Sequence, residues 1–236
     1  MWLNSKKMAE EFNEEPIVDI QEAYSKTEHF IEDNKKTIGT VVGVIFGVAL
    51  LVIAYKYWFI AGKEKAAQKE LFVAENYFEK DSLDKAIHGD GVSIGLEGIV
   101  RQYGLAPSGN LAHYYLGISY LKKGEFEKAI EQLKSFSAED IMVAPIATGA
   151  IGDCYVELNK VEEGINYYLK AAKQSTNKFT SPIYLKKAGL AYENLNKFKE
   201  AVTIYERIKT DFPKSTEAQD IDKYIARAKT QGNLNG

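Results

Sequence analysis

One uninterrupted apolar run stands out in the pattern of apolar and polar positions along the chain. It begins at Thr37 and contains no charged residue as far as Tyr55, and past a single lysine it continues to Gly62. As a helix, roughly 24 such residues span about 36 Å, and the hydrocarbon core of a membrane is about 30 Å thick. Lysines precede the run and aromatic residues end it, as is typical at lipid headgroups: Lys35, Lys36, Tyr55, Tyr57 and Trp58. The pattern predicts a single transmembrane helix over residues 37–60.

The position of the run favours a retained membrane anchor. A cleaved secretory signal is disfavoured because thirty-six residues precede the run and no A-x-A-like site follows it. A lipoprotein is disfavoured because the only cysteine, Cys154, lies deep in the chain. A buried core helix of a soluble protein seldom contains so long an apolar run.

The charges on either side of the predicted span do not by themselves determine its orientation in the membrane. Lysines are almost equally frequent on the two sides, so the positive-inside rule alone does not decide it. A long domain after a span can translocate largely regardless of its charge, whereas the charged tail would have to cross ahead of the anchor. We therefore expect the N-terminus in the cytoplasm and the C-terminal domain outside, with the reversed topology as the alternative.

Glycines recur every fourth residue within the run, at Gly39, Gly43 and Gly47. They share one helix face, where a second helix can approach closely. The alternative is that glycine is simply common in membrane spans. The spacing does not say whether a partner helix is another copy, which would make a homodimer, or a different membrane protein.

Residues 1–36 form an acidic tail that we expect to be partly helical. After Pro16, apolar residues fall at intervals typical of one helix edge: Ile17, Ile20, Tyr24 and Ile31. Partial disorder is the alternative, because charged residues and asparagine dominate residues 1–15.

From Asn110 onward the chain repeats itself. Glycines align at registers of 35 and 37 residues: Gly117, Gly152 and Gly189. Each is followed by an aromatic residue and then a turn residue: Tyr120, Tyr155, Tyr192; Gly124, Asn159, Asn196. A small and then a large residue come next: Ala129, Gly164, Ala201; Leu133, Tyr168, Tyr205. This spacing predicts helix pairs in which small residues permit close crossing and large residues fill the space between helices.

The repeating segments resemble tetratricopeptide repeats over roughly 100 residues. They read LAHYYLGISYLKKGEFEKAIEQL, IATGAIGDCYVELNKVEEGINYYLKAA and IYLKKAGLAYENLNKFKEAVTIYERI. One departure is that His113 and Thr148 stand where a bulky residue is usual. We expect three repeats over 110–213, a degenerate first repeat with a glycine-rich segment over 63–109, and a capping helix over 214–231 begun by Ser215. The fold class is all-α: one N-terminal transmembrane helix, then a repeat solenoid with a C-terminal cap.

Five further segments are distinctive in the whole layout: FIEDNKK before the span, YKYW after it, the GDG segment, SGNLAHYYLGISYL and IDKYIARAK. With these segments the chain resembles the YfgM-like family, an ancillary group of Sec translocon subunits, in its Bacteroidetes form. The resemblance implies a bacterial inner-membrane protein with a periplasmic repeat domain. It also implies three kinds of partner: Sec translocon subunits, a periplasmic chaperone or peptidyl-prolyl isomerase, and unfolded secretory polypeptides.

Composition narrows the function further. Basic and acidic residues are equal in number after the span, which disfavours nucleic-acid binding. A single cysteine allows no intrachain disulfide. The three histidines, His29, His88 and His113, have no paired Cys or His spacing typical of a metal, and no nucleophile has a recognisable base. We expect no enzyme activity, cofactor or metal, and we interpret Cys154 and His113 as core residues.

The first helix of each pair is expected to line a concave face that binds protein. The candidate residues for this groove are Leu111, Tyr114, Ile118, Leu121, Ile146, Val156, Ile183, Lys186 and Leu190, with Asp153 and Glu193 on the same face. A largely apolar groove favours unfolded segments or an amphipathic helix. The alternatives are that some of these residues pack within the domain, or that the chain is a self-associating structural anchor with no client.

Overall fold

The computed structural model describes residues 20–234, and every regular element in this range is helical. The all-α class expected from the sequence is thereby confirmed. The first nineteen residues of the predicted tail, including Ile17, lie outside the described residues. The chain divides into two compact units between Trp58 and Phe59, and each is described by itself.

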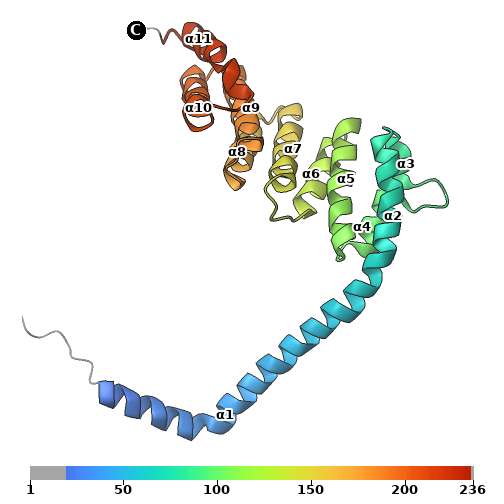
Figure 1. Ribbon diagram of the computed structural model, residues 1–236, viewed down its shortest axis with the longest axis vertical. Coiled ribbons are helices and arrows are strands. Elements are labelled where there is room, and N and C mark those ends of the chain that lie inside the picture. Colours follow the sequence, from blue (N-terminus) through green and yellow to red (C-terminus); the bar gives the residue numbers. More distant parts are fainter. Residues whose placement is uncertain (1–19, 235–236) are drawn as a thin grey trace, which may run out of the picture. The chain divides into compact units, whose positions relative to one another are not determined.

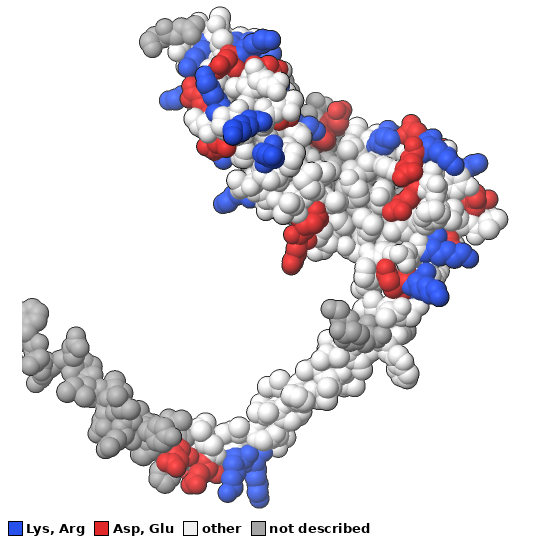
Figure 2. All heavy atoms as spheres, viewed as in Figure 1, with Lys and Arg blue, Asp and Glu red and all other residues white. Residues whose placement is uncertain are grey.

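The first unit is dominated by one long helix, α1 (Ile20–Ala54). It includes residues 20–36 of the predicted tail, a stretch that no glycine or proline interrupts. Figure 2 shows the second half of α1 as a stretch without charged side chains, which starts after a group of acidic and basic residues. Within its segment Phe30–Ala54, the most apolar 18-residue window has a mean hydropathy of 2.5, and none of that window is buried within the chain. By length and composition it fits a membrane anchor or a signal sequence.

The predicted span differs from this helix at its C-terminal end. The α-helical hydrogen-bond pattern stops at Ala54, and the backbone continues as a π-helix, Tyr55–Ile60. A π-helix bonds each amide to the carbonyl five residues earlier and is usually confined to a single turn. The aromatic residues that end the apolar run therefore lie on a wider helical turn.

The second unit is a row of helices joined by short turns (Figure 1). The first helices are α2 (Ala61–Glu79), α3 (Leu83–His88) and α4 (Gly95–Tyr103). Paired helices follow: α5 (Pro107–Lys123) with α6 (Phe126–Ser135), α7 (Val143–Glu157) with α8 (Val161–Gln174), and α9 (Thr180–Asn194) with α10 (Phe198–Asp211). A 3-10 turn, η2 (Glu217–Gln219), leads into α11 (Ile221–Gln231).

The turns inside the three pairs use the residues that the repeat pattern singled out. Gly124, Asn159 and Asn196 have φ values of 78°, 57° and 57°, in the left-handed region that glycine and asparagine tolerate best. Asp81, with φ 55°, closes α2 in the same way. There the amide of Ser82 donates to the carbonyl of Tyr77 at 2.9 Å, a helix-ending bond that satisfies an otherwise free carbonyl.

Glycines in the first helix of each pair face large side chains in the second, as predicted. A Cβ atom on Gly152 would lie 2.7 Å from the Tyr168 ring, and one on Gly117 would lie 2.6 Å from Leu133. Gly189 faces Tyr205 in the same way. Interiors are packed at crystal density, so the missing side chains are what allow these helices to cross closely.

The last helix covers the end of the stack. Its residues Ile221, Ile225 and Ala228 are buried, and the Tyr224 ring lies 5.6 Å from that of Tyr205. The expected role of Ser215 needs correction, because its hydroxyl accepts the amide of Ala218 at 3.2 Å and so caps η2 rather than α11. The short 3-10 turn separates this cap from the final helix.

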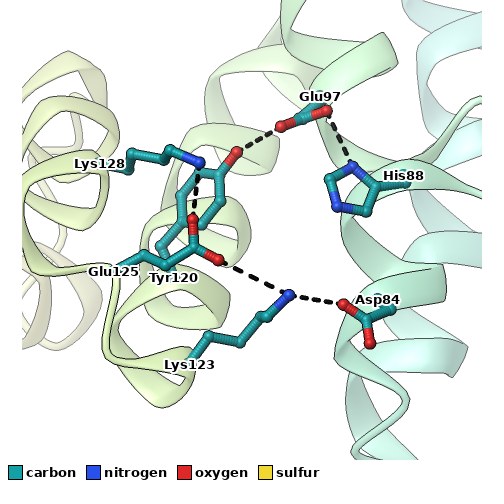
Figure 3. A network of polar contacts seen from close by, with 7 residues as sticks. All are labelled: Asp84, His88, Glu97, Tyr120, Lys123, Glu125 and Lys128. Atoms are coloured by element: carbon teal, nitrogen blue, oxygen red, sulfur yellow. Dashed lines mark hydrogen bonds and ion pairs between the residues drawn. The ribbon is translucent and has the colours of Figure 1, made fainter.

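A polar network fastens the glycine-rich segment to the first repeat pair (Figure 3). Glu97 of α4 lies 3.1 Å from the Nδ1 atom of His88 and accepts the hydroxyl of Tyr120 of α5. Lys123 pairs with Asp84 of α3 at 2.5 Å. Because these groups come from α3, α4 and α5, they fix the three helices against one another.

Candidate protein-binding groove

The candidate groove residues all lie on α5, α7 and α9, and they differ in how far they are covered. On α5, four are half-buried: Leu111, Tyr114, Ile118 and Leu121. On α7, two are half-buried: Ile146 and Val156. On α9, Lys186 is half-buried, while Ile183 and Leu190 are exposed. Coverage therefore decreases from the first of these helices to the last.

Three of the α5 residues, Tyr114, Ile118 and Leu121, pack against a cluster that includes Ala147, Ala150 and Ile151 of the next pair, while Leu111 packs against the cluster around α2–α5. The Tyr114 ring lies 5.5 Å from Tyr115 and 5.5 Å from Phe136, and burial raises the pKa of Tyr114. Leu121 packs against two hydrophobic clusters, one around α2–α5 and one around α7. These side chains contribute to the core as well as to the surface, so a substitution such as Leu121→Asp would also disturb folding.

The α9 residues line an open hollow of about 390 Å³ between α9 and the 216–220 segment. Ile183 and Leu190 are each 40% exposed there. Lys186 lies between them and pairs with Asp220 at 3.0 Å, with its ammonium 4.3 Å from the centre of the Tyr224 ring. Burial opposes the charge on Lys186, but the hydrogen bonds to Asp220 and Tyr224 outweigh it and raise its pKa. The hollow thus combines the apolar side chains of Ile183 and Leu190 with a border of polar and charged residues: Lys186, Lys187, Thr216, Glu217, Gln219 and Asp220.

A charged cluster joins α7, α8 and α9 beside the candidate groove residues. Lys187 of α9 contacts both carboxylate oxygens of Asp153 of α7 at 2.7 Å, and the Tyr168 hydroxyl of α8 donates to the same carboxylate at 2.6 Å. Burial and the carboxylate together raise the pKa of Tyr168. The same residues border a hollow of about 550 Å³ that also includes Val156 and Leu121. Charged side chains therefore stand beside the apolar candidate residues Val156 and Leu121.

Sequence reasoning placed Asp153 on this face but missed its partners. Lys187 is 34 positions away, and the repeat alignment alone gives no sign that the two meet. It also missed Gly149, whose absent Cβ makes room for the Tyr184 ring of the next repeat. The signal available was that Gly149 occupies the same repeat position as Tyr114 and Lys186, where a side chain is otherwise present.

The groups with catalytic chemistry are arranged as structural residues. Cys154 is fully buried, and burial followed by the charge of Asp153 raises its thiol pKa to about 12, so it stays protonated and unreactive. The Nδ1 atom of His113 lies 2.9 Å from the Gln132 side chain. Over residues 20–234, no group of three or more His, Cys, Asp or Glu side chains is placed to hold a metal ion.

The stacked helix pairs, their left-handed turns and their glycine-to-large contacts define an α-helical repeat protein. Residues 96–138 and 114–179 match one tetratricopeptide repeat model, and residues 186–215 match a second. The chain is a tetratricopeptide repeat protein, a class whose repeats mediate protein–protein interactions. The matches indicate no catalytic family.

Solved structures support the same fold. The chain is similar to the nearly identical TPR-like repeats of a Podosopora anserina protein provisionally described as a kinesin light chain, and equally to a single-substitution variant of it. Each has 14% sequence identity and a TM-score of 0.55, covering 73% of this chain and 89% of the other. At that identity the likeness concerns the fold alone. No curated protein matches the chain.

Proposed function

We propose that this protein is a membrane-anchored scaffold that binds segments of other polypeptides along the concave face of α5, α7 and α9. The observation that carries the proposal is the open hollow of α9, where Ile183 and Leu190 are each 40% exposed on either side of Lys186. A bound segment would cover both apolar side chains, and burial contributes about 25 cal/mol per Å² of apolar surface.

The groove favours a segment that is apolar on one side and polar on the other. Ile183 and Leu190 offer apolar contact, while the ion pairs of Lys186 with Asp220 and of Lys187 with Asp153 stand beside them. Both pairs leave part of their charge exposed to solvent, so an occupant can hydrogen-bond to them without first separating them. An amphipathic helix or an extended chain meets these requirements.

The location and partners that we propose rest on the YfgM-like resemblance together with the apolar helix α1. The protein would be anchored in the bacterial inner membrane, with its N-terminus in the cytoplasm and its repeats in the periplasm. Its partners would be Sec translocon subunits, a periplasmic chaperone or peptidyl-prolyl isomerase, and unfolded secretory polypeptides. Protease added to spheroplasts tests the topology, because only a periplasmic repeat domain would be digested.

Site-specific photo-crosslinking in membranes tests the groove. A photoreactive amino acid replaces Ile183 or Leu190 in the full chain, and Thr203, exposed on α10, serves as the matched control. We expect bands to translocon subunits or secretory polypeptides from the two groove positions, and none from position 203. Equal bands from all three positions, or none from the groove, would contradict the proposal.

A self-associating anchor is the second candidate function, favoured by the uncovered helix face that Gly39, Gly43 and Gly47 share. A Cβ atom added at Gly39, Gly43 or Gly47 would meet nothing within 4 Å in the described part of the chain. A second helix can therefore approach these positions closely. Disulfide crosslinking at Gly43→Cys with homodimer bands alone, and no client bands from Ile183, would favour this function.

A further inference from the structure

The loops that precede α5, α7 and α9, together with the first two residues of α5, form one continuous border of the repeat domain, which we call the loop edge (residues 104–108, 136–142 and 175–179). At its start, the amide and hydroxyl of Ser108 donate to the Glu64 carboxylate of α2 at 3.1 and 2.6 Å. The side chain of Asn110 then exchanges two hydrogen bonds with the backbone of Ser137, at 2.7 and 2.9 Å. The next link is Asn177, whose amide donates to the Ile141 carbonyl at 3.0 Å.

The loop edge exposes a large apolar side chain in each of its loops. Leu105 is 75% exposed, Ile141 is 65% exposed and Phe179 is 58% exposed. Single exposed apolar residues are ordinary, but one in every successive loop along a single border is a pattern. In the turns inside the pairs, by contrast, the apolar residues Leu158 and Leu195 are half-buried. The other turn residues there are polar or glycine: Lys123, Gly124, Glu125, Asn159, Lys160, Asn196 and Lys197.

The loop edge begins next to the predicted membrane boundary. Glu64, which holds Ser108, is four residues beyond Ile60, where the predicted span ends, and four helical residues rise about 6 Å. Ile60 and Leu105 line one hollow of about 530 Å³, together with Lys63 and Arg101. The first of the exposed apolar side chains therefore lies within the same small hollow as the last residue of the span.

We propose that the loop edge lies on the membrane surface, with Leu105, Ile141 and Phe179 inserted among the lipid headgroups. This inference rests on the proposed membrane anchoring. Apolar and aromatic side chains at this depth contact the upper acyl chains, and nearby cations contact lipid phosphates. Arg101 and Lys178 supply such cations, and the Lys178 ammonium lies 5.2 Å from the centre of the Phe179 ring.

Acidic residues on the loop edge would be repelled by anionic lipid headgroups, but its two acidic residues in the 136–142 loop differ in how far their charge is already satisfied. Asp140 accepts the amides of Met142 and Val143 at 2.7 and 2.5 Å, so its charge is directed at the start of α7. Those bonds hold its pKa below the usual range despite partial burial. Glu139 is exposed and remains the one acidic group of the 136–142 loop that faces solvent without such bonds.

Lipid quenching of single fluorescent labels tests the inference in the full chain. In a Cys154→Ala background, a cysteine replaces Leu105, Ile141 or Phe179 and carries an environment-sensitive dye. The matched controls, Lys160→Cys and Lys199→Cys, lie beside the turns of the opposite edge. The protein is reconstituted into phosphatidylethanolamine–phosphatidylglycerol vesicles containing lipids with a nitroxide near the headgroup. A label at Val48→Cys, near the centre of the predicted span, reports whether α1 is inserted, and it is read in matched vesicles whose nitroxide lies deep in the acyl chains.

We expect the nitroxide lipids to cause a large loss of fluorescence at positions 105, 141 and 179, and little or none at 160 and 199. Quenching at Val48 without quenching at 141 and 179 overturns the loop-edge contact but leaves the anchor intact. Equal quenching on both edges also overturns it, because the contact would not be specific to the loop edge. No quenching at Val48 refutes the membrane anchor itself, and the inference with it.

Discussion

Replacing Gly189 with alanine tests whether close helix crossing holds the last repeat together. The new Cβ would lie 2.7 and 2.8 Å from the Cζ and Cδ1 atoms of the Tyr205 ring. Tyr205 is fully buried, with the ring of Tyr224 5.6 Å away, so it has little room to move. Overpacking a core costs about 1–3 kcal/mol, while alanine gains about 1 kcal/mol over glycine within a helix. The Cε1 atom of the same ring is closer still, which places the overpacking cost at the upper end of its range, so we expect a net loss of stability of about 1–2 kcal/mol.

Thermal unfolding followed by far-UV circular dichroism measures this loss. For a domain of this size we expect Tm to fall by about 2–8 °C. Gly62→Ala is the matched control, because a Cβ there meets nothing within 4 Å, and its Tm should be unchanged or higher. Since repeats contact only their neighbours, amide hydrogen exchange should rise in α9–α11 more than in α5 and α6. A Gly189→Ala protein as stable as wild type, with unchanged exchange in α9–α11, would refute the reasoning.

Three further predictions concern the groove, the glycine-rich segment and the cysteine. Asp153→Ala and Lys187→Ala should each destabilise the domain. Because the ion pair is only partly exposed, a double-mutant cycle should give a coupling free energy of about 0.5–1 kcal/mol. If the effects of the two substitutions are additive, the pair contributes nothing to stability. Hydrogen bonds from the amides of Ser93 and Val92 and from a tyrosine hydroxyl lower the pKa of Asp90 to about 2. Because the folded pKa lies below the unfolded value, the turn should be intact above about pH 4 and open as the pH falls toward 2, seen as faster exchange of the Ser93 amide. Finally, a maleimide at mildly alkaline pH should label Cys154 only after a denaturant is added, and labelling of the folded protein would contradict its burial.

Local pattern in the sequence determined the helical elements and their crossings. The uncharged run is a property of one helix. The left-handed turns at Asn159 and Asn196 and the pairing of Gly152 with Tyr168 each depend on neighbours within one helix pair. Such short-range relations repeat along the chain, so periodicity reveals them without knowledge of how the pairs stack. The repeat class and the long apolar helix were predictable for this reason.

Only the tertiary structure decided what happens between pairs. The contact of Asp153 with Lys187, the packing of Tyr114 against α7 and the openness around Leu190 depend on the angle at which successive pairs stack. That angle results from side-chain packing across the interface, and no spacing along the chain encodes it. Sequence therefore named the candidate groove positions, while packing determined which of them remain open to a partner.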